Sequence, residues 1–265
     1  MEEQSVESFY NNRGWDMVGG NTNDALINEN LTPVARTYVS KVRKRILENL
    51  SSGGALLDVG CGPIQYPEYL EYSMNFDVRV CVDLSKKALI QAEQKIGAKG
   101  IFIEGDYLDI VTPMQAPFSG ATLINVLYHV HKSKQELLVR RILSDLLPGA
   151  KFVIVYSNPN TISARLTAFL VSVKRLAKNL NVLNSGSSSV NPIYFYRFPL
   201  DFWQKFQDVA KVETKAWRTF SPALEKLFFR RYAGGRAFLR FFYWLENFKF
   251  WTRFAEYTLV VMEKS

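Results

Sequence analysis

The stretch LLDVGCGPIQ, residues 56 to 65, decides the fold of this chain. An apolar run leads into two glycines one residue apart, Gly60 and Gly62, which is typical of a buried strand followed at once by a tight loop. Glycines in that place let backbone N–H groups approach a bound group closely. A dinucleotide-binding loop would carry a third glycine three residues later, where this chain has Gln65. The missing glycine speaks against a dehydrogenase.

Strands and helices alternate around this loop. The predicted strands are residues 55–60, 77–83, 101–106, 121–130 and 151–157. The predicted helices are residues 31–49, 86–96 and 133–147, the last opened by a Ser133–Glu136 capping box and stopped by Pro148-Gly149. Such alternation predicts an α/β fold with a doubly wound, mostly parallel sheet.

The pattern changes after the fifth strand. We predict helices over residues 161–180 and 200–210 and strands over 211–218 and 256–264. Residues 222–250 are aromatic, basic and helical in pattern, with a break at Gly234-Gly235. These C-terminal elements indicate segments inserted over one sheet.

Composition narrows the class of protein. The chain has 265 residues, of which 48% are hydrophobic, so it has enough apolar side chains for a core and is not disordered throughout. Its two cysteines favour a reducing compartment, and MEEQSVESFY at the start lacks the features of a secretory signal. We therefore expect a cytoplasmic protein.

Positive charge is concentrated in the C-terminal part. Residues 1–159 carry 16 Lys and Arg against 18 Asp and Glu, whereas residues 160–265 carry 17 against 7. This excess indicates an anionic partner, which could be a substrate phosphate, nucleic acid or a membrane surface. A solvated basic face is the alternative.

Polar residues follow the predicted strands at one edge of the sheet. Asp83 ends the second strand, 21 residues after Gly62, and Asp106 ends the third. Tyr107 follows Asp106, and Asn125 lies in the fourth strand. Asp83 could accept hydrogen bonds from ribose hydroxyls, and Asp106 from an adenine amino group. The alternatives are a helix cap at Asp83 and a turn at Asp106.

Five motifs occur along the chain in the order DVGCG, VCVD, EGD, INVLYHV and LLPGA. In these motifs the chain resembles the class I S-adenosylmethionine-dependent methyltransferases of the small-molecule type, such as quinone and natural-product methyltransferases. The resemblance covers residues 56–157 and, more weakly, the final strand. It implies a Rossmann-like sheet of seven strands with an antiparallel last strand, and S-adenosylmethionine as cofactor. The chain has Ile64 where many members have glycine, and Pro63 stiffens the turn.

The resemblance also implies roles for residues. Asp58, Gly60 and Gly62 would hold the methionine moiety, Asp83 the ribose, and Asp106 with Tyr107 the adenine. FYNNRGW, residues 9–15, is similar to the aromatic lid of many members. The implied cofactor-binding residues are Tyr10, Trp15, Asp58, Gly60, Cys61, Gly62, Asp83, Leu84, Asp106, Tyr107 and Asn125, and no metal ligand is assigned.

We accordingly predict a single methyltransferase domain over residues 1–265. Within it, residues 1–50 would form N-terminal lid helices and residues 51–159 the cofactor-binding core. Residues 160–198 and 220–252 would form inserted cap segments.

An oxygen or nitrogen acceptor usually loses a proton on methylation, so a base with a pKa near neutrality helps. His129 and His131 are the only histidines, and both follow the fourth strand. They would point the same way if the backbone there is extended. A structural role is the alternative for each. The candidate substrate-binding residues are Tyr128, Tyr194, Tyr196 and Arg197.

Several alternatives for function stay open. A methyltransferase acting on nucleic acid would suit the basic half, but the N/D-P-P-aromatic stretch of exocyclic-amine enzymes is replaced by NVLYH at 125–129. A catalytically inactive methyltransferase fold kept as a binding subunit is a further reading. We favour a small, lipid-like or aromatic acceptor.

The segment 227–254 interleaves aromatic residues with Lys and Arg and contains a single Glu. Such a mixture suits shallow insertion among lipid headgroups, the roof of an apolar pocket, or a dimer interface. The plain alternative is an insertion that covers the sheet. We favour a membrane-facing or acceptor-binding role, and the oligomeric state stays open.

Overall fold

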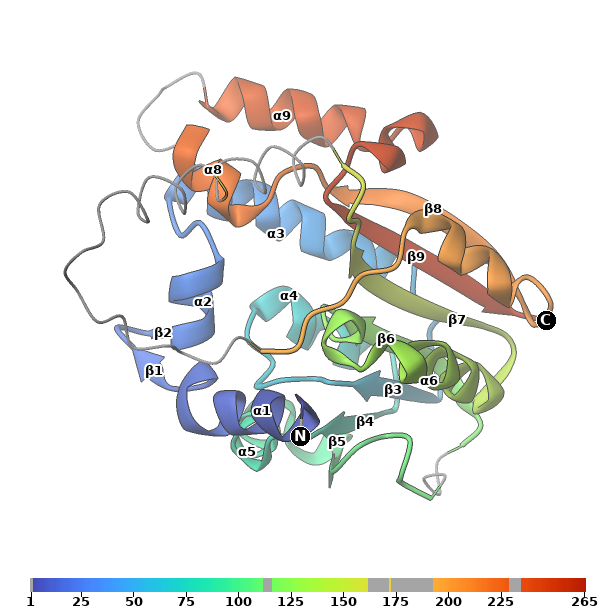
Figure 1. Cartoon of the computed structure of the whole chain (residues 1–265). Helices are drawn as coiled ribbons and strands as arrows, with labels where there is room; N and C mark the ends of the chain where they lie inside the picture. The colour runs from blue at the N-terminus through green and yellow to red at the C-terminus, as the bar shows by residue number, and fades with distance from the viewer. Residues whose placement is uncertain (1, 112–115, 162–171, 173–192, 229–234) are drawn as a thin grey trace.

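A seven-stranded sheet runs through the centre of the molecule in the order β5-β4-β3-β6-β7-β9-β8 (Figure 1). The computed structural model describes residues 2–111, 116–161, 172, 193–228 and 235–265. The strands of the sheet are β3 (Ala55–Val59), β4 (Val78–Asp83), β5 (Gly100–Glu104), β6 (Phe118–Ile124), β7 (Leu146–Ser157), β8 (Ala210–Arg218) and β9 (Tyr257–Lys264). Strands β3 to β7 pair in parallel, and β9 is antiparallel to both of its neighbours. The predicted sheet is confirmed.

Helices cover both faces of this sheet (Figure 1). They are α1 (Glu2–Phe9), α2 (Asn23–Asn28), α3 (Pro33–Glu48), α4 (Pro67–Leu70), α5 (Lys86–Ile96), α6 (Lys132–Ser144), α8 (Pro222–Phe228) and α9 (Gly235–Leu245). Short turns of other helix types are η1 (Tyr10–Gly14), η2 (Glu71–Met74), η3 (Gly97–Lys99), η4 (Leu127–His129), η5 (Leu200–Phe206) and η6 (Lys249–Arg253). A small hairpin, β1 (Met17–Val18) and β2 (Asn21–Thr22), precedes α2.

Alternate residues of the strands bury two separate cores. Leu57 and Ile154 belong to the core that includes α6 and η5, whereas Leu56 and Val155 belong to the core under α3 and α9. This follows from the period of two along a strand that is covered on both faces. The order of the strands reverses beside β3, and the crevice at such a switch point is the usual ligand site of an open α/β sheet.

The structure differs from the sequence prediction around β6 and α6. Strand β6 ends at Ile124, because Asn125 has a φ of 60° and the chain then turns through η4. Helix α6 begins at Lys132 and is capped by the side chain of His131, so the predicted capping box is replaced. It ends at Ser144, because β7 already begins at Leu146.

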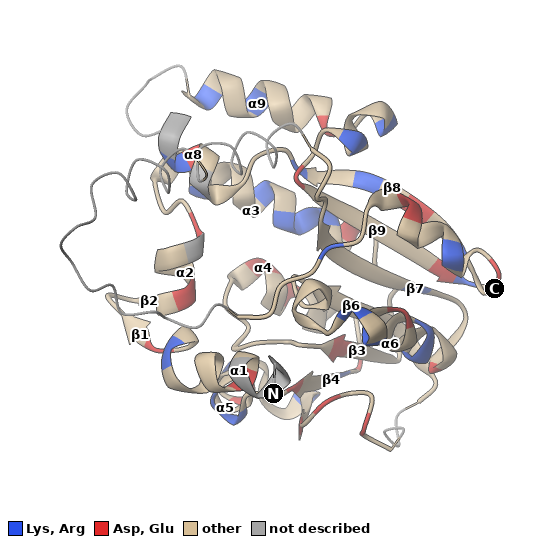
Figure 2. Ribbon diagram, viewed as in Figure 1, with Lys and Arg blue, Asp and Glu red and all other residues tan. Residues whose placement is uncertain are grey.

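Other differences lie in the C-terminal part. The predicted helix 200–210 is a 3₁₀ turn, η5, and the predicted helical segment 222–250 contains the separate helices α8 and α9. The predicted helix 161–180 and most of the segment 160–198 fall outside the described residues. Lys and Arg, blue in Figure 2, recur on α3, α9 and β8. No helix of the described residues could cross a membrane.

Candidate active site

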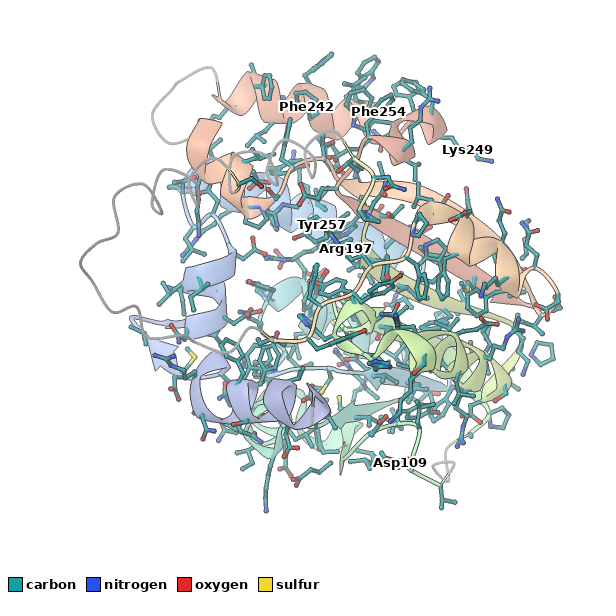
Figure 3. All side chains as sticks on the ribbon, in the orientation of Figure 1. Asp109, Arg197, Phe242, Lys249, Phe254 and Tyr257 are labelled. Atoms are coloured by element: carbon teal, nitrogen blue, oxygen red, sulfur yellow. The ribbon has the colours of Figure 1, made fainter. Side chains whose placement is uncertain are left out.

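A cavity of about 1070 Å³ opens over the carboxyl ends of the strands. This volume lies just above the range of roughly 300–1,000 Å³ for ligand pockets, so the cavity is large enough for more than one small ligand. We distinguish two parts of its lining. The strand-end lobe contains Gly60, Gly62, Asp83, Asp106, Asn125 and His129. The aromatic lobe contains Tyr66, Tyr69, Trp217, Arg218 and Tyr257 (Tyr257 is labelled in Figure 3).

The loop after β3 needs both of its glycines. Gly60 has a φ of +67° and Gly62 a φ of +57°, which is the left-handed region that side chains rarely adopt. A Cβ atom on Gly60 would lie 2.3 Å from Cγ2 of Val126. Ile64 also has a positive φ, of 48°. Its side chain is buried, so packing offsets a conformational cost of about 1–2 kcal/mol.

Asp83 connects this loop to the next strand. Its Oδ2 accepts a hydrogen bond from the backbone N–H of Gly62 and its Oδ1 from that of Ser85, both at 2.8 Å. Burial raises the pKa of the Asp83 carboxyl to about 6, although these two hydrogen bonds act in the opposite direction. Each carboxylate oxygen has a further lone pair, so Asp83 can accept from two more donors in the cavity.

The cavity lining also contains buried polar atoms that have no partner among the described residues. Oδ1 of Asn125 and Nε1 of Trp15 are both buried and make no hydrogen bond within this part of the chain. Such atoms are costly unless a ligand satisfies them. Asp106 accepts a hydrogen bond from the N–H of Leu108 at 3.0 Å and keeps acceptor capacity towards the cavity. The strand-end lobe therefore offers a polar ligand three acceptors, on Asp83, Asn125 and Asp106, and one donor, on Trp15.

The N-terminal segment closes one side of the strand-end lobe. The rings of Tyr10 and Trp15 stack with centroids 4.7 Å apart, and both line the cavity. Trp15 lies against the glycine loop, because a Cβ on Gly62 would be 3.4 Å from its ring. Gln91 donates to the carbonyl of Trp15, and Ser85 to Oδ1 of Asn11. These bonds attach the segment to α5 and the turn before it.

His129 lines the cavity beside Tyr128. Nδ1 of His129 lies 3.0 Å from the carbonyl oxygen of Tyr194, and because a carbonyl only accepts, Nδ1 carries the proton. Burial lowers the pKa of the His129 imidazole, which favours the neutral ring. In that tautomer Nε2 has a free lone pair and can accept a proton.

Several predicted site residues lie outside the cavity lining. They are Asp58, His131, Tyr194, Tyr196 and Arg197. His131 caps α6, because the turn at η4 separates it from His129 and the two do not share an extended strand. Arg197 donates to Oγ of Ser157 at 2.9 Å.

Residues 193–198 face the cavity with a different set of side chains from the one that we predicted. Ile193 and Phe195 line it, whereas Tyr194 and Tyr196 do not. The N–H of Tyr196 donates to the carbonyl of Tyr128 at 2.8 Å, which fixes the segment beside η4. The two tyrosines do alternate with the lining residues, but the sequence alone could not tell which side faces inward.

Asp58 and Tyr107 are part of the supporting structure. Oδ2 of Asp58 accepts from Nη2 of Arg79 at 2.5 Å, and its Oδ1 accepts from Oγ1 of Thr122 at 2.7 Å. Arg79 also donates to the carbonyl of Tyr69 at 2.6 Å. Tyr107 reaches the cavity lining, but its ring is buried in the core and its hydroxyl donates to Oδ2 of Asp145 at 2.8 Å.

The aromatic lobe was missed in the sequence. Its residues come from the loop and helix after β3, the end of β8 and the start of β9, and an isolated aromatic residue looks like ordinary core. Beneath it lies a buried ion cluster. Glu29 pairs with Arg43 at 3.1 Å and with Arg218 at 3.0 Å, and Arg218 also pairs with Glu225 at 2.8 Å. The guanidinium carbon of Arg43 lies 3.2 Å from the centroid of the Tyr66 ring, so the two groups stack.

Comparison with known proteins identifies the class. Residues 33–190, more than half of the chain, match the family described as methyltransferase domain, so the chain belongs to this family. No curated protein matches the sequence. The class predicted from the sequence, an S-adenosylmethionine-dependent methyltransferase, is confirmed.

Solved structures of low sequence identity share the fold. The N-methyltransferase NodS from Bradyrhizobium japonicum WM9, in complex with S-adenosyl-L-homocysteine, is 11% identical, with a TM-score of 0.55 and coverage of 99% of this chain and 97% of that one. The DhpI-SAM-HEP complex is 12% identical, with a TM-score of 0.58 and coverage of 98% and 97%. Magnesium protoporphyrin IX methyltransferase ChlM from Synechocystis PCC 6803, with bound SAH, is 14% identical, with a TM-score of 0.53 and coverage of 98% and 99%. S-adenosylmethionine is the cofactor of this class.

Proposed function

We propose that the protein transfers a methyl group from S-adenosylmethionine to an oxygen, nitrogen or carbon atom of a small aromatic or lipid-like acceptor. The observation that carries this proposal is the continuous cavity, which extends from the strand-end lobe into a lobe lined by four large aromatic side chains. Tyr10 and Trp15 close one side, so a small molecule fits this cavity better than a nucleic-acid strand.

The strand-end lobe suits the cofactor. Asp83 can accept from the two ribose hydroxyls, and the glycine loop leaves space for close backbone approach. Oδ1 of Asn125 and the carboxylate of Asp106 offer acceptors to amino groups, and Trp15 offers a donor. When bound, the cofactor supplies an electrophilic methyl group; the chain has to orient the acceptor and exclude water.

His129 is the proposed base. It lies in the cavity lining in contact with Tyr10, with ring centroids 6.4 Å apart, and Nε2 is the nitrogen that can take a proton. An acceptor hydroxyl or amine would give up its proton to this atom as the methyl group is transferred. His131 has no part in this proposal, because it caps α6.

The aromatic lobe is the proposed acceptor site. Tyr66, Tyr69, Trp217 and Tyr257 present flat apolar surfaces, which favour a planar or long apolar molecule. The guanidinium of Arg218 provides a polar group in the same wall, although its charge is balanced by Glu29 and Glu225. A neutral hydroxyl or carbonyl on the acceptor therefore fits this lobe better than a free anion. Because a long apolar acceptor partitions into lipid, we propose that the enzyme works beside a membrane, and its two cysteines favour the reducing cytoplasm.

A labelled-methyl screen tests this function. The protein is incubated with S-adenosylmethionine carrying a labelled methyl group and with phenols, quinols, lipid extracts or RNA. Trp217→Ala should reduce transfer to a true small acceptor while its affinity for S-adenosylhomocysteine, measured by calorimetry, stays within about twofold. Asp83→Ala serves as the matched variant that should lose cofactor affinity by about 1–3 kcal/mol. The assignment would be overturned if the label were found only in RNA. It would also be overturned if Trp217→Ala lowered the affinity for S-adenosylhomocysteine as much as Asp83→Ala does.

A further inference from the structure

Helix α9 and the turn η6 expose a row of large aromatic side chains. Phe241 is 50% exposed, Trp244 54% and Phe250 54%, and Phe238 and Phe248 are exposed as well. Four of the rings form a row of contacts, with centroids 5.9 Å apart for Phe241 and Trp244, 4.8 Å for Trp244 and Phe248, and 5.9 Å for Phe248 and Phe250, whereas Phe238 contacts the ring of Phe242. We call these five residues the aromatic face. Such a concentration on one exposed surface marks an interaction site.

The orientation of the aromatic face is fixed by the opposite side of α9. Leu239 is buried in the core under α3, and Glu246 is buried directly after the helix. Glu246 pairs with Arg45 of α3 at 2.9 Å and accepts hydrogen bonds from Tyr38 and from the N–H of Thr219. Because α9 packs along α3 through these buried contacts (Figure 1), the rings on its other side remain directed away from the protein.

The charges on this surface have one sign. Arg236, Arg240, Lys249 and Arg253 are exposed, and the single acid between residues 235 and 254 is the buried Glu246. Within the described part of the chain, no carboxylate pairs with these four cations. Figure 2 shows the basic residues on α9 and the turn after it, and Figure 3 shows Lys249 projecting outward.

We propose that the aromatic face, with the four flanking cations, docks onto the surface of an anionic lipid bilayer. Aromatic rings are favoured at the level of the headgroups, and Lys and Arg bind the phosphates there. Helix α9 has only 11 residues, so it lies in the plane of the interface and does not span the bilayer. A second copy of this chain is a poorer partner, because a two-fold interface would bring the same four cations against each other.

Vesicle flotation tests the proposal. The protein is mixed with vesicles of phosphatidylcholine alone, or of phosphatidylcholine with phosphatidylglycerol, at low salt and at about 0.5 M salt, where the Debye length falls to a few ångströms. The protein should float with the anionic vesicles at low salt, and much less with neutral vesicles or at high salt. Arg236→Glu with Arg240→Glu should weaken this binding by about tenfold or more, and Phe241→Ser with Trp244→Ser by a similar factor.

A matched pair of variants controls for net charge. Lys86→Glu with Lys211→Glu makes the same change in net charge at exposed positions outside the aromatic face, and should leave vesicle binding within about threefold. A thermal-shift assay of S-adenosylhomocysteine binding shows whether each variant is folded. This assay does not depend on vesicle binding. The proposal is overturned if the wild-type protein stays unbound at low salt, if both charge variants lose binding equally, or if the Phe241/Trp244 variant converts a dimer to a monomer on gel filtration without affecting flotation.

Discussion

Asp83 and His129 line the same cavity, and burial shifts the pKa of each side chain in the direction that favours its uncharged form. The carboxyl pKa of Asp83 rises to about 6, whereas the imidazole pKa of His129 falls below its usual range. At neutral pH Asp83 is therefore a carboxylate that can accept hydrogen bonds, and His129 is a neutral ring that can accept a proton. Both states are the ones that the proposed roles require.

We expect the affinity for S-adenosylhomocysteine to depend on Asp83 and on pH. As the pH falls through about 6, Asp83 takes up a proton and loses acceptor capacity, so affinity should fall by about tenfold between pH 7 and pH 5. Calorimetry across this range measures the effect. The dependence should disappear in Asp83→Asn and persist in His129→Ala. If Asp83→Asn retains the full pH dependence, another group is responsible for it.

The two histidines should behave differently in kinetics. His129→Gln removes the proposed base and should lower kcat by about 10²–10⁴-fold on the true acceptor, with little change in cofactor affinity. His131→Gln changes the cap of α6 at a residue outside the cavity lining and should keep kcat within about twofold. In the wild-type enzyme, kcat/KM should decline at acidic pH as His129 becomes protonated, since its pKa lies below the usual value. Equal losses in the two variants would remove His129 from catalysis.

At the scale of elements, the N-terminal segment packs against α2, α5 and the glycine loop. It is attached through Asn11, Trp15 and the ion pair of Asp16 with Lys87, and it contacts the glycine loop through the ring of Trp15. A ligand that satisfies the buried Nε1 of Trp15 would add to these contacts. The position of this segment should therefore depend on whether the strand-end lobe is occupied.

Limited proteolysis measures this dependence. Arg13 is exposed in η1, and S-adenosylhomocysteine should slow tryptic cleavage after it by at least about fivefold, because binding stabilises the closed segment. Mass spectrometry of the released fragment gives the rate. Asp83→Ala, which should bind the ligand weakly, provides the control and should show little protection. Cleavage at the same rate with and without ligand in the wild type would contradict a closing role.

Which elements could be predicted follows from how local their signals are. The inner strands could be predicted because short apolar runs buried on both faces leave a clear pattern, and Gly60, Gly62 and Asp83 because the motif around them is local. The end of β6 could not be predicted, since it depends on the positive φ of Asn125. The aromatic lobe could not be predicted either, because Tyr66 and Trp217 meet only in the folded chain.

At the scale of the whole molecule, Glu246 joins three regions that are far apart in the sequence. It links α3 through Arg45 and Tyr38, the chain after β8 through Thr219, and the end of α9. Burial raises the pKa of Glu246, while Arg45 lowers it. This network decides where α9 lies.

Removing the Glu246 carboxylate should destabilise the fold. Glu246→Ala leaves the buried Arg45 without its anion and should lower the free energy of unfolding by about 3–5 kcal/mol, as measured by urea denaturation. Glu213→Ala removes an exposed partner of Lys215 and should cost less than about 1 kcal/mol. Similar losses in both variants would mean that the buried network contributes little to stability.

The pair of Asp58 and Arg79 connects the two ends of the cavity. Asp58 lies in the strand that leads into the glycine loop, and Arg79 also holds the carbonyl of Tyr69 in the aromatic lobe. If the glycine loop shifts when the cofactor binds, this pair would therefore transmit the shift to the aromatic lobe. By thermodynamic reciprocity, each ligand would then change the affinity of the other by the same factor. Calorimetric titration of S-adenosylhomocysteine with and without acceptor should show this cooperativity, and Arg79→Lys should reduce it.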